Sequence, residues 1–339
     1  MLLRIEHETV LSYDSPVFEH VFELRMAPVS NDDQTSLGYR LRVSPLVPST
    51  PYRDGNGNRV ELITVLAPCQ KITVRATSFV RTHRRPASER IADIHLVDAG
   101  SDQPGALDAL DYCSFTSLTD NGPWLNELVA KLGSTGDWPL EVFFRKTTEL
   151  IKSLLKYEKS KTEAGTPASE ALKLGAGVCQ DFSHLFICIC RKLGVPCRYV
   201  SGYIHQPGEI ESHAWVQVWA GAAQGWVDYD PTHSCLVADD HVVVAVGRDY
   251  ADVPPNRGAW RGNAKESIQV GVRVQSVPRL PADWIDADSL PLAIIGRESG
   301  GGGGGGRRHG RPSVRQFQRM LYRQQQHQQQ QEQDQQQQS

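Results

Sequence analysis

The sequence predicts an α+β protein in which a β-rich N-terminal part precedes a domain of helices and strands. Three features of the 339-residue chain indicate this. Residues 2 to 82 alternate apolar and polar side chains in short runs, residues 124 to 193 repeat apolar side chains at spacings of three and four, and residues after 197 return to alternating runs. The later domain therefore places helices first and an antiparallel sheet second.

The N-terminal part consists of alternating runs separated by turn-forming residues. The runs are "LLRIEHETVLSY", "HVFELRMAP", "GYRLRVSPL", "RVELITVLA" and "QKITVRATSFVRTH". The stretch "VPSTPYRDGNGN" is rich in proline, glycine and asparagine, which is typical of turns. We therefore expect an antiparallel β-sandwich over residues 1–100, without a catalytic cluster.

The middle of the chain has helical periodicity. Apolar residues recur on one face from Trp124 to Leu132 and again from Val142 to Leu155, which predicts two packed helices. The stretch "EALKLGAGVCQDFSHLFICICRKLG" then predicts a short helix, a glycine-rich break and a second helix that ends at Gly194.

Strands follow the helices. The segments are "CRYVSGYIH", "HAWVQVWA", "GWVDYDPTH", "HVVVAVG" and "SIQVGVRVQSV". Together with the helices they define an α+β domain over residues 101–290. A glycine run and a glutamine-rich end occupy residues 297–339, where we expect a disordered tail.

Composition and charge exclude several partners. The net charge is only -3 and the charges are interspersed, so neither nucleic acid nor an anionic membrane surface is expected as a partner. No apolar run approaches the ~18 residues that span a bilayer, and the first residues lack the apolar core of a signal peptide, so we expect a cytoplasmic protein. Seven cysteines without a CxxC pair argue against a disulfide framework and a structural zinc site. The oligomeric state stays open.

Cys179 differs from the other cysteines in its position within "GAGVCQDFSHLF". Two glycines permit a tight turn before it, and an apolar helix follows it. The N-terminus of a helix favours the thiolate, which is the nucleophilic form of cysteine. We expect Cys188, Cys190 and Cys197 to be buried thiols instead. Cys179 is therefore the candidate nucleophile.

A cysteine nucleophile needs an imidazole beside it and an acid that orients the imidazole. His213 opens the predicted strand "HAWVQVW", and Asp230 ends the predicted strand "GWVDYD". Two adjacent strands would bring these residues together beside the head of the helix. Asp228 shares a strand face with Asp230 and competes for the role, although the Asp-Pro-Thr context favours Asp230.

Four blocks of the sequence carry a family resemblance. The blocks "GAGVCQDFSHLFICICRKLGVPCRYVSGY", "ESHAWVQVW", "GWVDYDPTH" and "VAVGRDYADVPPNRG" resemble those of the bacterial transglutaminase-like family, part of the papain-like superfamily. The resemblance covers residues 1–280 in architecture and is block-specific over residues 157–258. It implies a papain-like transglutaminase core for the later domain. It also implies a catalytic triad of Cys179, His213 and Asp230 that works through a thioester.

Other polar residues near these blocks have structural interpretations beside functional ones. Asp181 is expected to interact with the helix dipole, and His184 to be a packed or surface histidine. Trp215 shares a face with His213 and either shields the Cys–His pair or belongs to the core. The loop at residues 248–250 either lines the mouth of a cleft or is held by an internal salt bridge.

The functional classes that remain are two enzymes and a binding module. His205, His233 and His241 show no metal-ligand spacing along the chain, so neither a metal nor a cofactor is expected. Hydrolysis of a peptide or amide substrate is favoured, because the resemblance implies that small bacterial members are more often proteases or amidases. Transglutamination, in which an amine resolves the same thioester, and non-catalytic peptide binding are the alternatives.

Overall fold

The structure is a computed structural model that describes residues 1–91, 93–99, 107–207 and 212–284. These residues belong to one compact unit that extends from Met1 to Pro291. The tail expected over residues 297–339 lies outside the described residues. None of the described helices has the length and apolar character that crossing a membrane requires.

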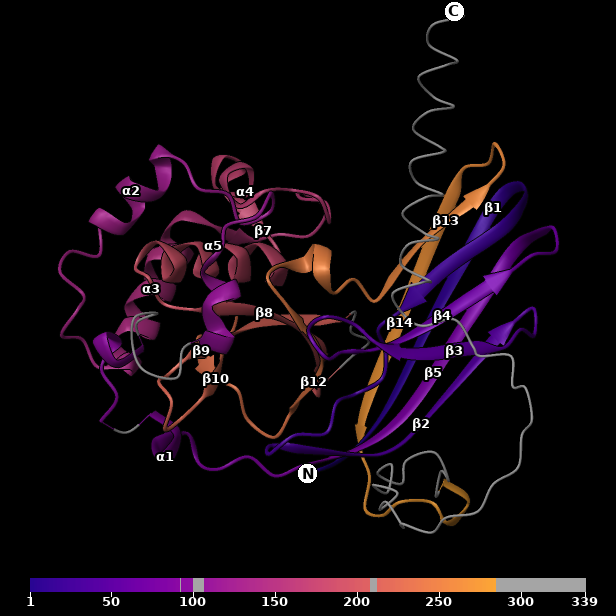
Figure 1. Cartoon of the computed structure of the whole chain (residues 1–339), viewed down its shortest axis with the longest axis horizontal. Helices are drawn as coiled ribbons and strands as arrows, with labels where there is room; N and C mark the ends of the chain where they lie inside the picture. Colours follow the sequence, from indigo (N-terminus) through magenta and orange to yellow (C-terminus); the bar gives the residue numbers. More distant parts are fainter. Residues whose placement is uncertain (92, 100–106, 208–211, 285–339) are drawn as a thin grey trace, which may run out of the picture. The chain divides into compact units, whose positions relative to one another are not determined.

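The N-terminal part is a curled antiparallel sheet (Figure 1). Its first five strands lie in the order β2-β5-β1-β4-β3. Their bounds are β1 (Leu2–Leu24), β2 (Gln34–Ser44), β3 (Ser49–Arg53), β4 (Arg59–Val65) and β5 (Cys69–Thr82). The predicted alternation is confirmed, since buried and half-buried side chains alternate along the first half of β1.

Strand β1 connects two halves of this sheet. Its first half pairs with β5, and its second half, from His20 to Leu24, pairs with β4. The register shifts between Ser12 and Val17, where the strand passes from one set of partners to the other. A shift of this kind bends a strand and increases its twist, which accounts for the curl of the sheet.

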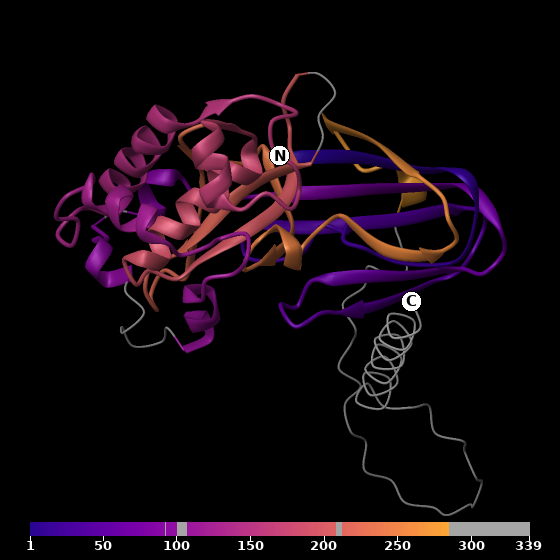
Figure 2. The same cartoon turned by 90° about the horizontal axis from the view of Figure 1, so that it is seen from above.

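Two strands from the C-terminal side of the chain complete the same sheet. β13 (Asn256–Arg261) and β14 (Glu266–Ser276) both pair with β1 in antiparallel fashion. Figure 2 shows these orange strands beside the indigo first strand. The sequence assigned these residues to the domain at 101–290, and the structure differs because alternation shows that a strand has one buried face but does not identify its neighbour.

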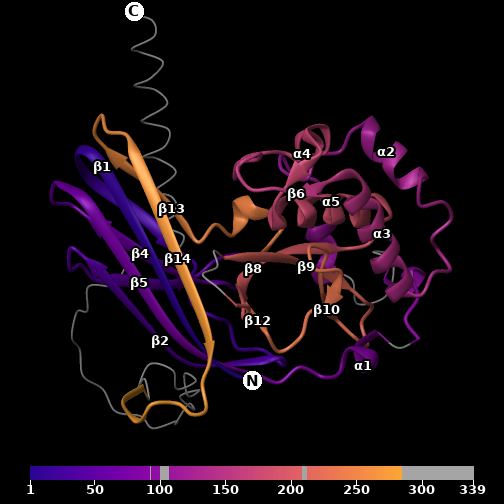
Figure 3. The same ribbon diagram turned by 180° about the vertical axis from the view of Figure 1, so that it is seen from behind.

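The second sheet has five antiparallel strands in the order β11-β10-β9-β8-β12. Their bounds are β8 (Cys197–Ile204), β9 (His213–Trp219), β10 (Trp226–Asp230), β11 (Cys235–Leu236) and β12 (His241–Gly247). Helix α5 packs against β8 and β9. Figure 3 shows the longer helices together on one side of this sheet.

The predicted helices are confirmed with small changes of their ends. The four longer ones are α2 (Pro123–Ala130), α3 (Leu140–Leu154), α4 (Ala168–Leu174) and α5 (Cys179–Lys192). Their apolar faces join the sheet in one core, in which the rings of Phe144, Phe186 and Tyr229 lie 4.7 to 6.0 Å apart between centroids. The remaining short elements are α1 (Ala87–Ile91), the 3-10 turns η1 (Leu96–Ala99), η2 (Leu107–Cys113), η3 (Tyr250–Asp252) and η4 (Ala282–Trp284), and the parallel pair β6 (Lys156–Tyr157) and β7 (Ala176–Gly177).

Two side-chain amides connect the first sheet to the edge strand of the second. Gln34 donates to the carbonyl of Val243 at 2.9 Å and accepts from its N–H at 2.8 Å. Asn58 makes the same two bonds with Val246, both at 2.8 Å. An edge strand exposes unpaired backbone N–H and carbonyl groups. The two amides form hydrogen bonds with these groups at two residues of β12, as a neighbouring strand would.

Candidate active site

Cys179 is the first residue of α5, as the sequence predicts. Gly175 ends α4 in the left-handed region with φ 65°, a conformation that costs glycine little. Asp181, in the first turn of α5, accepts a hydrogen bond from the N–H of Val178 at 2.8 Å and so closes the start of the helix. The thiol of Cys179 is half-buried, whereas Cys188 and Cys190 further along α5 are fully buried.

The turn before Cys179 has no room for a larger residue. A Cβ atom on Gly177 would lie 2.6 Å from both Cβ and Oδ2 of Asp181. The same Oδ2 accepts a hydrogen bond from the Thr162 hydroxyl at 2.7 Å. Burial raises the pKa of Asp181, although these hydrogen bonds oppose the rise. Asp181 therefore has a structural role that fixes the head of the helix.

His213 and Asp230 come together at the ends of two neighbouring strands. His213 opens β9, Asp230 closes β10, and the two strands are antiparallel neighbours. The His213 Nε2 atom lies 2.7 Å from Asp230 Oδ2. The thiol of Cys179 also acts on the His213 ring, since it contributes to the rise in the pKa of this imidazole. Because Nε2 is engaged by Asp230, Nδ1 is the nitrogen left for the thiol.

The electrostatics of this trio favour a charged imidazole. Burial disfavours the imidazolium, but hydrogen bonds to Asp230 and Cys179 outweigh burial and raise the pKa of His213 to about 10. Burial also opposes the charge on Asp230, yet hydrogen bonds from three imidazoles hold the pKa of its carboxyl well below the usual range. At neutral pH the His213 ring is therefore in its charged form.

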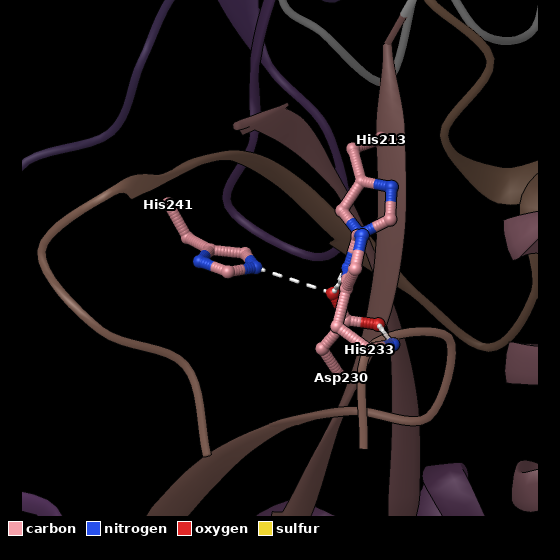
Figure 4. A group of neighbouring side chains, drawn as sticks. All are labelled: His213, Asp230, His233 and His241. Carbon is pink, nitrogen blue, oxygen red and sulfur yellow. Dashed lines mark hydrogen bonds and ion pairs between the residues drawn. The ribbon is translucent and has the colours of Figure 1, made fainter. Parts of the chain in front are cut away.

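Two further histidines contact Asp230, and sequence reasoning missed both. His233 Nδ1 lies 2.6 Å and His241 Nε2 3.3 Å from the Oδ2 atom that His213 also contacts (Figure 4). The backbone N–H groups of Thr232 and His233 donate to the other carboxylate oxygen at 2.8 and 3.2 Å. His233 follows Asp230 by three residues, and the turn expected after Asp-Pro could have indicated that its side chain folds back onto Asp230. His241 opens a different strand and carried no signal in the sequence.

Asp228 does not reach His213. Its Oδ1 accepts hydrogen bonds from the indole of Trp215 at 2.7 Å and from the Gln217 amide at 3.0 Å. The Trp215 ring is fully buried and stacks on His213, with 6.0 Å between ring centroids and 29° between planes. Trp215 thus covers the imidazole, while its N–H is engaged by Asp228.

The remaining residues singled out in the sequence have structural partners. His184 is buried, its Nε2 accepts the N–H of Tyr250 at 3.2 Å, and burial lowers the pKa of His184 to about 3. Arg248 pairs with Asp252 at 2.9 Å, and Asp249 accepts the N–H of Ala251 at 2.8 Å. An internal salt bridge therefore holds the loop at residues 248–250, which was one of its two interpretations.

Two protein families match the chain. The transglutaminase-like superfamily matches residues 136–231, and the bacterial transglutaminase-like N-terminal region matches residues 3–81. The first match contains Cys179, His213 and Asp230. It also agrees with the papain-like core expected from the sequence.

Two mycobacterial relatives span most of the chain. An uncharacterised protein of Mycobacterium leprae is 31% identical over 285 residues, which cover 80% of this chain and 98% of the relative. An uncharacterised protein of Mycobacterium tuberculosis is 30% identical over 291 residues, which cover 81% and 92%. The relatives therefore share both parts of the described architecture, not only the segment that holds Cys179.

A solved structure has the same fold. It belongs to a protein from Cytophaga hutchinsonii described as a candidate cysteine protease, and it superposes with a TM-score of 0.66 at 22% sequence identity. The superposition covers 83% of this chain and 93% of that chain. The predicted fold class, α+β with an antiparallel β-rich N-terminal part followed by a papain-like core, is thereby confirmed. The sandwich expected over residues 1–100 takes the form of one curled sheet whose two halves share β1.

Proposed function

This chain belongs to the transglutaminase-like superfamily, and from that premise we propose that it is a thiol-dependent enzyme that transfers acyl groups from amide bonds to water. One observation carries the proposal. The Nε2 atom of His213 lies 2.7 Å from Oδ2 of the buried Asp230, and the thiol of Cys179, at the head of α5, raises the pKa of the same imidazole. This order of nucleophile, proton carrier and orienting acid is the arrangement that acyl transfer through cysteine requires.

The first half of the reaction forms a thioester. The Cys179 sulfur attacks the carbonyl carbon of the amide, and the C–N bond breaks as His213 gives its Nδ1 proton to the leaving amine. Asp230 keeps the ring oriented and stabilises its charged form. The first N–H groups of α5 lack partners within the helix, so the N–H of Cys179 is a suitable donor to the oxyanion. The Trp215 indole, engaged by Asp228, is not the second donor.

The second half returns the enzyme to its starting state. Water attacks the thioester carbonyl while His213 accepts one of its protons. The C–S bond then breaks, the acid product leaves, and the sulfur is again a thiolate beside the charged ring. A primary amine that attacks in place of water gives transamidation. We favour water, because the family resemblance of the sequence implies a protease or amidase more often than a cross-linking enzyme. The Cytophaga neighbour described as a candidate cysteine protease agrees with that choice.

The decisive experiment measures the reactivity of each cysteine separately. The native protein and His213→Ala are treated with iodoacetamide at neutral pH, and mass spectrometry quantifies alkylation at every site. We expect Cys179 to react at least ten times faster than Cys69 in the native protein and to lose this advantage in the variant. Equal rates at both cysteines in both proteins would reject the enzyme and favour the peptide-binding module.

Hydrolysis and transamidation are then separated with a panel of peptide amides. Release of the amine without an added nucleophile, abolished in Cys179→Ala and retained in Cys69→Ala, supports a hydrolase. Product formation only when a primary amine is supplied would identify a transferase instead.

A further inference from the structure

The acid of the proposed triad lies inside a cluster of three histidines that the triad does not require. The donor atoms of His213, Asp230, His233 and His241 all lie within 4.8 Å of one another. They come from β9, the end of β10, the following turn and the start of β12. Figure 4 shows the His241 ring directed at Asp230 from the side opposite to the strand that carries His213.

The donor set suits a zinc-type ion. Imidazole nitrogen and carboxylate oxygen are common ligands of Zn²⁺, at roughly 2.0 to 2.2 Å in a tetrahedral arrangement. Ligand atoms in such a site lie about 3.3 Å apart. The three nitrogens already lie 2.6 to 3.3 Å from the carboxylate oxygen. His233, whose side chain is 41% exposed, has room to adjust and gives an ion access from solvent.

A second, independent contact orients one of these rings as in a metal site. His241 Nδ1 lies 2.7 Å from Oδ1 of Asp240, which directs Nε2 toward the cluster. Metal-binding histidines usually carry a carboxylate or carbonyl on the nitrogen that faces away from the metal. The contact with Asp240 thus holds the His241 ring so that its Nε2 atom faces Asp230. Packing alone would not require a carboxylate on the other ring nitrogen.

We propose that His213, Asp230, His233 and His241 form a site for a divalent transition-metal ion, for which Zn²⁺ is the best match, and that its occupation inhibits the enzyme. The ion replaces the protons that join the three rings to Asp230, and these protons leave to solvent. Four protein ligands leave no open position for water or substrate, so the ion is not a catalytic one. The inhibitory part rests on the proposed function, because the ion holds the ring that moves the proton for Cys179.

Binding is tested without reference to activity. Co²⁺, whose visible absorption reports tetrahedral coordination, is titrated into the full-length Cys179→Ala variant, and Zn²⁺ is then added as competitor. We expect one equivalent of Co²⁺ to bind and Zn²⁺ to displace it, whereas Ca²⁺, which prefers oxygen ligands, leaves the spectrum unchanged. No tetrahedral cobalt spectrum in this variant would overturn the proposal whatever the fate of the proposed enzyme activity.

Variants locate the ion. In the same Cys179→Ala background, His233→Ala should weaken binding at least ten-fold, and Asp240→Asn, which changes only a half-exposed residue behind His241, should weaken it about 10- to 100-fold. His205→Ala serves as the matched control, since that ring contacts the carbonyl of Val274 away from the cluster. Unchanged affinity in both His233→Ala and Asp240→Asn would place the ion elsewhere and reject the site.

Inhibition is tested on the native protein. Saturating Zn²⁺ should abolish turnover of a peptide amide and slow the alkylation of Cys179 only to the rate measured for His213→Ala, because the thiol loses its imidazole partner but is not among the ligands. Alkylation of Cys179 far slower than in His213→Ala would show that the ion binds the thiol instead, and full turnover in saturating Zn²⁺ would refute the inhibition.

Discussion

Asp230 holds the candidate site together through several contacts on one buried carboxylate. Its Oδ2 receives three imidazoles, while its Oδ1 receives two backbone N–H groups of the following turn. A charge this deeply buried is tolerated only when it is paired and hydrogen-bonded. The carboxylate therefore fixes the turn after β10 as well as the ring of His213, and its replacement should affect both stability and chemistry.

Asp230→Asn, studied in the presence of a metal chelator, tests the effect of this carboxylate on His213. The amide cannot stabilise an imidazolium, so we expect the pKa of His213 to fall from about 10 toward the ordinary 6.5. The ring carbons of labelled histidine, followed by NMR, report this directly. A His213 ring that still titrates near pH 10 in the variant would contradict the role given to Asp230.

The difference in unfolding free energy between the native protein and Asp230→Asn should also depend on pH. Because the folded pKa of His213 is raised, its contribution is complete below about pH 6.5 and is lost as the pH rises toward 10. Because the folded pKa of Asp230 is depressed, its contribution is present above about pH 4 and is lost in more acidic solution. The native protein should therefore exceed the variant in unfolding free energy by the largest margin, several kcal/mol, between about pH 4 and 6.5. Urea unfolding at pH 5.5 and pH 9.5 measures the change, and equal margins would refute it.

At the scale of single residues, the sequence predicted part of the candidate site. Cys179, His213 and Asp230 could be predicted, since each stands at the end of a recognisable element. The contact of His241 with Asp230 could not, because it depends on the order of strands in the sheet. The sequence context favoured Asp230 over Asp228, and the structure adds the reason, because the Trp215 indole and the Gln217 amide engage Asp228.

At the scale of elements, the position of Cys179 depends on the short connection between α4 and α5. Gly177→Ala would place a Cβ atom 2.6 Å from the side chain of Asp181, which holds the head of α5. We expect a loss of about 1 to 3 kcal/mol in unfolding free energy, typical of overpacking. The reactivity of Cys179 toward iodoacetamide should fall with it.

The control is Gly165→Ala, where an added Cβ meets nothing within 4 Å. Thermal denaturation and cysteine alkylation of the two variants are measured side by side. If Gly177→Ala matches Gly165→Ala in both readouts, the turn is not as constrained as the contact distances indicate.

The elements themselves were largely predictable, but their partners were not. The helices at 124–132, 142–155 and 179–193 agree with α2, α3 and α5 within a few residues. Strand periodicity located the segment that forms β14, yet it gave no reason to pair β14 with β1. Pairing is decided by burial of whole faces and by sheet geometry, which involve residues far apart in the chain.

At the scale of the whole molecule, two amides tie the first sheet to β12. Replacing Gln34 by Leu leaves the buried N–H of Val243 without its partner, while the carbonyl still accepts from Val29. Asn58→Leu removes the partners of both backbone groups of the half-buried Val246. Each unsatisfied buried group costs about 1 to 3 kcal/mol. We expect either variant to lower the midpoint of urea unfolding clearly and the double variant to lower it further.

Gln70→Leu, an exposed glutamine on β5, serves as the matched control and should leave the midpoint nearly unchanged. If Gln34→Leu behaves like Gln70→Leu, the amide contacts with β12 contribute nothing to the coupling of the two sheets.

The pairing of β1 with β14 also affects the order in which the chain can fold during its synthesis. Leu3 pairs with Ser276 and Tyr13 with Glu266, so β1 is translated more than 250 residues before the strand that becomes its neighbour. Until then one edge of β1 exposes its backbone, and such distant pairings form slowly. The helices and strands that carry Cys179, His213 and Asp230 leave the ribosome in between. The nascent chain therefore contains Cys179 before its first sheet is complete.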